Sequence, residues 1–157
     1  MRQAAVCAIV CVKNAVATLD RTLDSISTQI LPPDFGPLET IVIDGGSSDG
    51  SAECAARREG VRLLRQQGAG LASARNEAIR ATQADFIAFC DADDWWSEDS
   101  LRLRLRHFSS APDIGAVIGK VMLEAVPGER SSPAQDALIG VARPGYTPGA
   151  LVARRET

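Results

Sequence analysis

The sequence has few of the residues that zinc sites, disulfide frameworks and nucleic-acid-binding surfaces require. Among 157 residues there is one histidine, His107, so a zinc site is not expected. The formal net charge is −3 and there is no basic excess, which disfavours a nucleic acid as partner. No apolar stretch is long enough to cross a bilayer, so no transmembrane segment is expected.

The four cysteines, Cys7, Cys11, Cys54 and Cys90, form no CxxC pair. Cys7 and Cys11 are four residues apart in an expected strand. They therefore face the same side of that strand and are too far apart to form a disulfide. We interpret all four as reduced thiols of a cytoplasmic protein.

Apolar runs rich in β-branched residues alternate with segments of helical spacing. The runs cover residues 6–12, 38–43, 61–64, 86–90 and 114–123. The first indicates a buried strand and not a signal peptide, because no small-residue cleavage site is clear. The second and fourth runs are nearly continuous apolar stretches, which is typical of strands covered on both faces.

Helix candidates lie between these runs. They cover residues 17–29, a segment from the N-cap cluster 47–49 to about Gly60, residues 71–82, and a segment from Ser97 to Ser109 with Glu98 and Asp99 in its first turn. Residues 127–133 are expected to form a loop, and the tail 142–155 contains a short apolar piece, 150–153. The alternating order predicts one α/β domain, with a mainly parallel sheet between helix layers.

Two of the expected strands end in acidic turns. Residues 38–43 are followed by Asp44 and a glycine- and serine-rich turn, and residues 86–90 are followed by Asp91-Ala92-Asp93-Asp94. Ligands of open α/β sheets bind outside the carboxyl ends of the strands. Because parallel strands end at the same edge, both turns are expected at one site.

The second turn predicts a divalent metal site. Three carboxylates within four residues repel one another, and Mg²⁺ or Mn²⁺ bound by carboxylates and substrate phosphates would remove that conflict. An acidic loop that caps the next helix is the alternative. Trp95 and Trp96, directly after the acids, favour a pocket wall, with core anchors of the following helix as their alternative.

Two glycine-containing turns precede helices. The turn after Asp44 allows close approach of an anion, but it has neither the Gly-Lys-Ser/Thr of a P-loop nor the GxGxxG of a dinucleotide fold. Gly68 and Gly70 form a loop before the third helix. On the first turns of that helix, Arg75 is placed to bind a phosphate, with a solvated arginine as the alternative.

Together these segments resemble the inverting family-2 glycosyltransferases, which have the GT-A fold, a three-layer α/β/α arrangement. Residues 6–14 are similar to the family's first strand and PxYN turn, with Cys11 for proline, Lys13 for tyrosine and Asn14 matching. Residues 44–50 are similar to its DDGSxDG or DGGSxDG segment. Residues 70–79 resemble its GxxxARNxGI segment, with Ala78 for glycine. Residues 89–95 resemble its FLDxDD segment, which carries the DxD motif.

The resemblance implies a nucleotide-sugar site formed by Cys11, Asn14, Asp44, Gly46, Arg75, Asp91 and Ala92. The Asp44 turn would hold the base, often uracil, and Arg75 would reach the nucleotide or its diphosphate. Asp91 would lie near the ribose and, with Asp93, would bind Mn²⁺ or Mg²⁺, while Asp94 is a helper or a structural cap. Many members have an acid where Gly45 stands, so the identity of the base stays open.

The resemblance also implies a reaction. A sugar would pass from a nucleotide-diphosphate sugar, expected to be UDP-linked, to the hydroxyl of a glycan or lipid-linked acceptor, with inversion and with a metal ion. The enzyme is expected in the cytoplasm or at the cytoplasmic membrane face, and a homodimer is left open.

The catalytic general base is not found in this sequence. In the family it usually lies in an acidic pair beyond a GALxxRR-like stretch, which residues 149–156 resemble, and Glu156 is too early for that role. We therefore expect residues 1–157 to be one domain that is truncated before the base. A non-catalytic nucleotide-sugar-binding module is the alternative. A DxD phosphatase is disfavoured, because that fold carries its motif on the first strand and this chain has it on the fourth.

Overall fold

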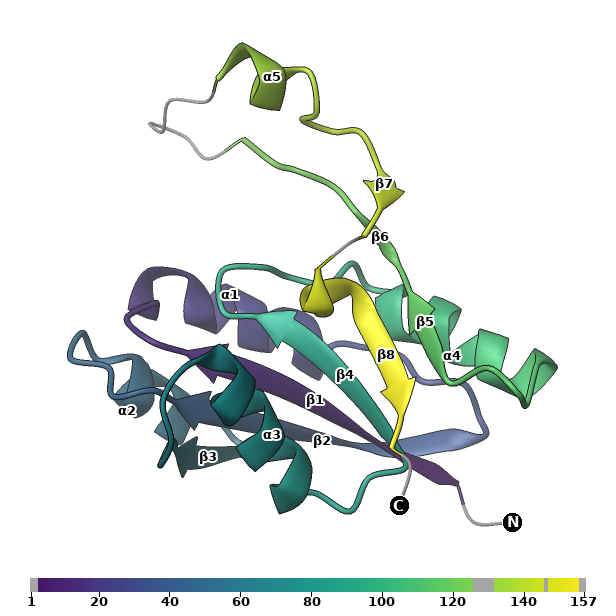
Figure 1. Cartoon of the computed structure of the whole chain (residues 1–157), viewed down its shortest axis with the longest axis horizontal. Coiled ribbons are helices and arrows are strands. Elements are labelled where there is room, and N and C mark those ends of the chain that lie inside the picture. Colours follow the sequence, from purple (N-terminus) through teal and green to yellow (C-terminus); the bar gives the residue numbers. More distant parts are fainter. Residues whose placement is uncertain (1–2, 126–131, 146, 156–157) are drawn as a thin grey trace.

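A computed structural model shows a six-stranded sheet between two layers of helices (Figure 1). The structure describes residues 3–125, 132–145 and 147–155. The strands are β1 (Ala4–Val12), β2 (Phe35–Asp44), β3 (Val61–Arg65), β4 (Phe86–Asp91), β5 (Ala116–Ile118), β6 (Lys120–Val121), β7 (Arg143–Pro144) and β8 (Leu151–Arg154). The helices are α1 (Val16–Ser27), α2 (Ser51–Ala56), α3 (Leu71–Ala81), α4 (Ser100–Ser110), α5 (Pro133–Asp136) and the 3₁₀ helix η1 (Pro148–Ala150).

The main sheet has the order β3-β2-β1-β4-β8-β5. β1 pairs in parallel with both β2 and β4, and β2 pairs in parallel with β3. β8 is antiparallel to its neighbours β4 and β5. The predicted α/β fold with a mainly parallel sheet is therefore confirmed, and the carboxyl ends of β1, β2, β3 and β4 share one edge.

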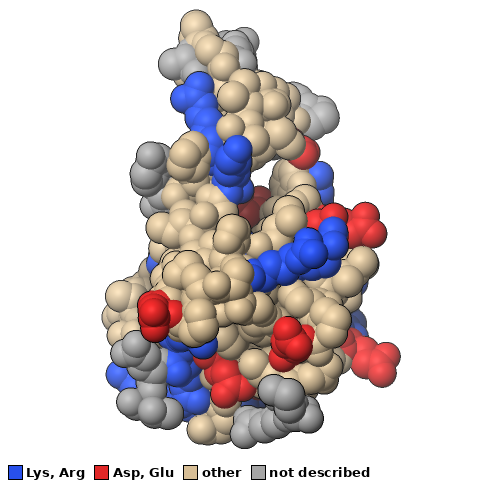
Figure 2. All heavy atoms as spheres, turned by 90° about the vertical axis from the view of Figure 1, so that its right-hand side faces the viewer, with Lys and Arg blue, Asp and Glu red and all other residues tan. Residues whose placement is uncertain are grey.

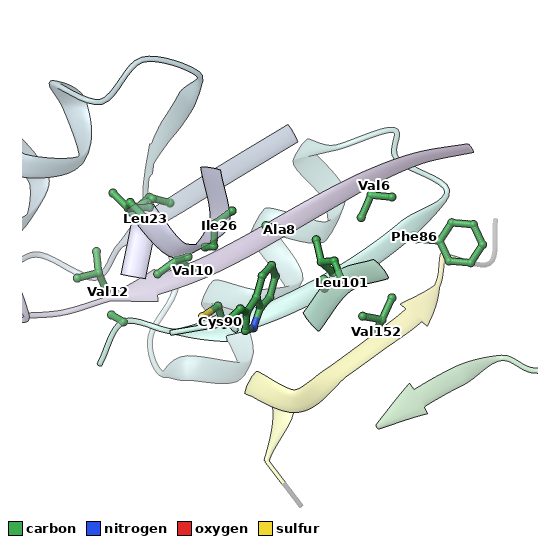
Figure 3. Close-up of a cluster of buried hydrophobic side chains, with 14 of the residues drawn as sticks. Val6, Ala8, Val10, Val12, Leu23, Ile26, Phe86, Cys90, Leu101 and Val152 are labelled. Atoms are coloured by element: carbon green, nitrogen blue, oxygen red, sulfur yellow. The ribbon is translucent and has the colours of Figure 1, made fainter. Parts of the chain in front are cut away.

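Both faces of the central strands are buried. Val6, Ala8, Val10 and Val12 of β1 pack in one cluster with α1, α2 and α4 (Figure 3). The alternate residues of β1, among them Cys7 and Ile9, pack on the other face against α3. Cys11 joins this second cluster, so Cys7 and Cys11 do face the same side, and none of the four cysteines forms a disulfide.

Three sequence predictions are corrected by the structure. The run 114–123 is not one strand: it divides at Gly119 into β5 of the main sheet and β6 of a two-stranded sheet with β7. A Cβ at Gly119 would lie 3.2 Å from Arg104 Cδ, and the Gly119 amide donates to the Ala150 carbonyl. The Gly119 carbonyl accepts from the Gly145 amide, so on the two sides of Gly119 the chain pairs with different strands, β8 and β7.

The other two corrections concern helix boundaries. α4 begins at Ser100, so Glu98 and Asp99 precede the helix instead of forming its first turn. Arg102 of the first helical turn donates to the Asp99 carboxylate, which holds Asp99 just before the helix. α2 begins at Ser51, after the expected N-cap cluster, with Gly50 as N-cap and the Asp49 carboxylate accepting from the Ser51 amide and hydroxyl. It ends at Ala56 and not near Gly60, because a turn in which the Val61 amide donates to the Arg58 carbonyl leads into β3.

The short apolar piece 150–153 forms most of β8, which the sequence analysis did not identify as a strand. Between β5 and β8 the chain makes an arm, whose described residues 120–125 and 132–145 include β6, α5 and β7; Figure 2 shows it standing off the body with a hollow between them. Of the loop expected at 127–133, residues 127–131 lie outside the described part, and Pro133 begins α5 behind a Ser132–Gln135 capping box.

No single-sign surface dominates the face drawn in Figure 2, where basic and acidic side chains are interspersed. Among the helices that the structure describes, none is long and apolar enough to span a membrane.

Candidate nucleotide-binding site

The two acidic turns meet at one edge of the sheet, as predicted. In the strand register Val12 of β1 lies opposite Asp44 of β2, and Cys11 of β1 lies opposite Asp91 of β4. Asp44 and Asp91 therefore lie on the two strands that flank β1, with only β1 between them. Sequence segments far apart along the chain thus form a single rim.

The turn after β2 is held by side chains predicted as ligand contacts. The buried Asp44 carboxylate accepts from the Gly46 amide at 3.1 Å and from the Ser47 amide at 3.1 Å. Asn14, in the left-handed region with φ of 55°, accepts from the Ser48 amide at 2.8 Å, while its own amide donates to the Ser47 hydroxyl at 3.0 Å. Asp44 and Asn14 therefore shape this turn.

The turn after β4 is fastened to α1 by two threonines that sequence reasoning missed. The Thr18 hydroxyl donates to the Ala92 carbonyl at 2.8 Å. The buried Thr22 hydroxyl lies 3.0 Å from the Ala92 carbonyl and 2.7 Å from the Asp94 carbonyl. In the sequence, the one sign of this role is that Thr22 interrupts the apolar face of α1. The backbone of Ala92, a predicted binding residue, is thus engaged by α1.

Arg75 and Asp91, predicted as separate contacts, form an ion pair. Arg75 Nη2 lies 3.0 Å from Asp91 Oδ1, and the guanidinium carbon is 5.5 Å from the centre of the Phe89 ring. The Arg75 side chain is 19% exposed, so it is not a solvated helix arginine. Its guanidinium therefore places a positive charge at the rim, next to the acidic turn.

The carboxylates of the second turn interact with one another. Partial desolvation, and then the charges of Asp93 and Asp91, raise the pKa of Asp94 above its ordinary value. Gly149 of η1 approaches this group so closely that a Cβ there would lie 3.2 Å from Asp91 Oδ2 and 3.3 Å from Asp94 Oδ2. Two carboxylate oxygens therefore face the same point beside the η1 backbone.

In the described part of the chain, no group of three or more His, Cys, Asp or Glu side chains is arranged to hold a metal ion. A magnesium-type ion usually takes one or two protein carboxylates and completes its shell with water and substrate phosphates. The carboxylate oxygens of the turn after β4 can supply the one or two protein ligands that such an ion needs.

The two tryptophans after the acids differ. Trp96 is buried in the core and its indole Nε1 donates to the Gly149 carbonyl at 3.3 Å, as a core anchor does. Trp95 is partly exposed, with the Arg21 guanidinium carbon 3.2 Å from the centre of its ring. Only Trp95 is placed to form part of a pocket wall.

A cavity of about 430 Å³ opens beside the carboxyl end of β1. It is lined by Cys11, Val12, Lys13, Ile43, Gly45, Gln66, Gly68, Ala69, Gly70, Leu71 and Ala74. Of the predicted binding residues only Cys11 lines it; burial raises the pKa of the Cys11 thiol to about 11, so it stays neutral. The charge of Arg75 lowers the pKa of this thiol and the charge of Asp91 raises it. The ion pair therefore lies close to the cavity.

Glu77 of α3 fixes the loop that forms one wall of the cavity. Its carboxylate accepts from the Gln67 amide at 2.8 Å, from the Gly68 amide at 2.9 Å and from the Ser73 hydroxyl at 2.9 Å. The first two hydrogen bonds, from backbone amides, are the main cause that lowers the Glu77 pKa.

We expect Glu77→Gln to loosen this loop and to remove its pH dependence. Because the pKa is lowered, the ordered loop is fully favoured above the ordinary pKa of glutamate and is released as pH falls through the lowered value. In NMR titrations, the Gln67 and Gly68 amide shifts should therefore move with a midpoint below about 4.3. Amide exchange at both positions should be faster in the variant by about tenfold. A midpoint at or above the ordinary value would contradict this role.

Comparisons with known proteins show the family to which this chain is similar. The profile of the family described as Glycosyl transferase family 2 matches residues 7–147. EpsH of Bacillus subtilis, named as a glycosyltransferase, is 30% identical over 118 residues, which are 73% of this chain and 33% of EpsH. Glycosyltransferase GlyA of Streptococcus pneumoniae is 35% identical over 95 residues, 58% of this chain and 13% of GlyA. The chain thus spans about a third or less of these two relatives.

Solved structures show the same fold. The mannosyltransferase PcManGT from Pyrobaculum calidifontis, in complex with GDP-Man and Mn²⁺, superposes with a TM-score of 0.66 at 26% identity, over 80% of this chain and 37% of that protein. TarS of S. aureus in complex with UDP superposes with a TM-score of 0.63 at 19% identity, over 82% and 38% of the two chains. The predicted GT-A fold is confirmed.

Proposed function

Since this chain belongs to glycosyl transferase family 2, we propose that it binds the nucleoside-diphosphate-sugar donor of a glycosyl transfer to an acceptor hydroxyl. The observation that carries this proposal is the common rim. Asp44, the Arg75–Asp91 ion pair and the cavity all lie around the carboxyl end of β1. A cation, a group of acids and a cavity side by side suit a ligand with a base, a ribose and a diphosphate.

In this arrangement the base enters the cavity beside Cys11 and the turn formed by Asp44 and Gly46. Asn14 acts through that turn, whose Ser48 amide it binds. Arg75 exchanges part of its contact with Asp91 for the diphosphate, because a guanidinium binds phosphate oxygens with two parallel hydrogen bonds. Asp91 and Ala92 then lie along the ribose.

Asp91 and Asp93 would hold Mn²⁺ or Mg²⁺, which neutralises the diphosphate leaving group when it is bound. The carboxylate oxygens of this turn are hard ligands of the kind these ions take. Asp94, whose pKa is raised in the free protein, lies beside them. That PcManGT, which has the same fold, was solved with GDP-Man and Mn²⁺ supports an ion together with a nucleotide sugar at this edge.

The complete reaction that we propose is a direct displacement. The acceptor oxygen forms a bond to the sugar carbon while the bond from that carbon to the diphosphate breaks, which inverts the centre. The acceptor proton passes to a general base. No described residue is assigned that role, and Glu156 lies outside the described residues. The cytoplasmic location, the glycan or lipid-linked acceptor and the homodimer stay predictions.

Calorimetry with UDP and GDP, with and without Mn²⁺ or Mg²⁺, tests the proposal. We expect binding at least about tenfold tighter with the ion, because the ion bridges the acids and the diphosphate. Equal affinity with and without the ion would contradict the metal role, and no binding of either nucleotide would contradict the donor site. Turnover of a nucleotide sugar by this chain would exclude the alternative of a binding module.

A further inference from the structure

The cavity has no carboxylate in its lining. Its only charged lining residue is Lys13, and its only carboxamide is Gln66, directly after β3. A nucleobase needs partners for the donors and acceptors on its edge, because an unpaired buried polar group is costly. The structure therefore leaves Gln66 as the lining side chain that can offer both an acceptor and a donor.

The orientation of this carboxamide is fixed. Gln66 Nε2 donates to the Gly70 carbonyl at 2.9 Å, and a carbonyl can only accept, so the nitrogen must point that way. The Gln66 backbone amide donates to the Asp44 carbonyl at 2.9 Å, which holds the residue beside the first turn. Oε1 then lies over Gly45, 3.0 Å from where a Cβ of that residue would be.

We propose that Gln66 reads the base edge and selects keto bases, uracil and guanine, over amino bases, cytosine and adenine. This inference rests on the proposed donor site. Uracil and guanine carry a ring N–H beside a carbonyl, which matches Oε1 as acceptor and the second hydrogen of Nε2 as donor. Cytosine and adenine carry a ring lone pair at that position, and it would face the lone pairs of Oε1.

Binding of UDP, GDP, CDP and ADP with Mn²⁺ to the full chain tests the inference. We expect the wild type to prefer UDP or GDP over CDP and ADP by about tenfold, the size of one hydrogen bond with an otherwise unpaired partner. Gln66→Ala should reduce this preference to near unity. It should leave inorganic pyrophosphate binding unchanged.

Gln67→Ala is the matched control, because the Gln67 side chain donates to the Arg65 carbonyl and does not line the cavity. A second variant restores the acceptor from the opposite side. Gly45 does not have a positive φ, and the tightest neighbour of an added Cβ is the end of the Gln66 side chain. Gly45→Asp combined with Gln66→Ala should therefore recover most of the preference for UDP or GDP.

Three outcomes separate the possibilities. Loss of the preference in Gln66→Ala and its recovery in the double variant support the inference. Equal binding of all four nucleotides by the wild type, or an unchanged preference in Gln66→Ala, would overturn it while the proposed donor site stands. If the wild type binds none of the four nucleotides, the proposed function fails, and this inference with it.

Discussion

Asp93→Ala is expected to reduce the affinity for UDP in the presence of Mn²⁺ to the metal-free value. In any assay where sugar transfer is measurable, it should lower turnover by about 10³-fold, the size of losing one preorganised charge-stabilising group. Asp93 lies exposed in the turn between the Arg75-bound Asp91 and Asp94. Its exposed carboxylate is open to an incoming ion.

The same substitution should not destabilise the protein. Without a metal ion, Asp93 is one of the charges that raise the pKa of Asp94, so its removal relieves repulsion within the turn. Thermal unfolding of the metal-free variant should therefore occur at the wild-type temperature or slightly above it. Mn²⁺ electron paramagnetic resonance in the presence of UDP would measure ion binding directly.

Asp99→Ala removes the same charge a few residues away and is the control. Asp99 pairs with Arg102 at the start of α4, and that contact lowers its pKa. Metal-dependent UDP binding should be unchanged in this variant. Wild-type Mn²⁺ dependence in Asp93→Ala would show that Asp93 is not a metal ligand.

The sequence predicted the central strands and the shared rim because the physical signals there are local. Buried parallel strands such as β1 and β4 are continuous apolar runs, and the acids that follow them mark their carboxyl ends. The order of strands and helices then requires right-handed crossovers, which bring those ends together. Each step used only neighbouring residues and a general rule of topology.

Features that depend on distant partners could not be read in this way. β8 has only four residues, and its place between β4 and β5 depends on pairing with strands far earlier in the chain. The ion pair of Arg75 with Asp91 depends on how α3 packs over the sheet. Gln66 is one polar residue after a strand, and only the space above Gly45 gives it a role.

Gly149→Leu is the second substitution with a large expected effect, at least about thirtyfold on UDP binding with Mn²⁺. The Cβ would lie 3.2 Å from Asp91 Oδ2 and 3.3 Å from Asp94 Oδ2, and the rest of the leucine would extend among these oxygens. The Gly149 carbonyl accepts from the buried Trp96 indole, so the backbone cannot easily retreat. The carboxylates must therefore move from the point that they share.

Backbone strain does not confuse this test, because Gly149 does not have a positive φ. Gly115→Leu is the matched control: Gly115 also lacks a positive φ, and a Cβ added there would meet no heavy atom within 4 Å beyond its chain neighbours. Gly149→Ala, which adds one carbon, should give a smaller loss in the same direction and covers the case in which the leucine variant does not fold. If both Gly149 variants bind UDP with Mn²⁺ as the wild type does, the Asp91 carboxylate beside Gly149 is not needed for ion binding, and its assignment as a metal ligand together with Asp93 is wrong.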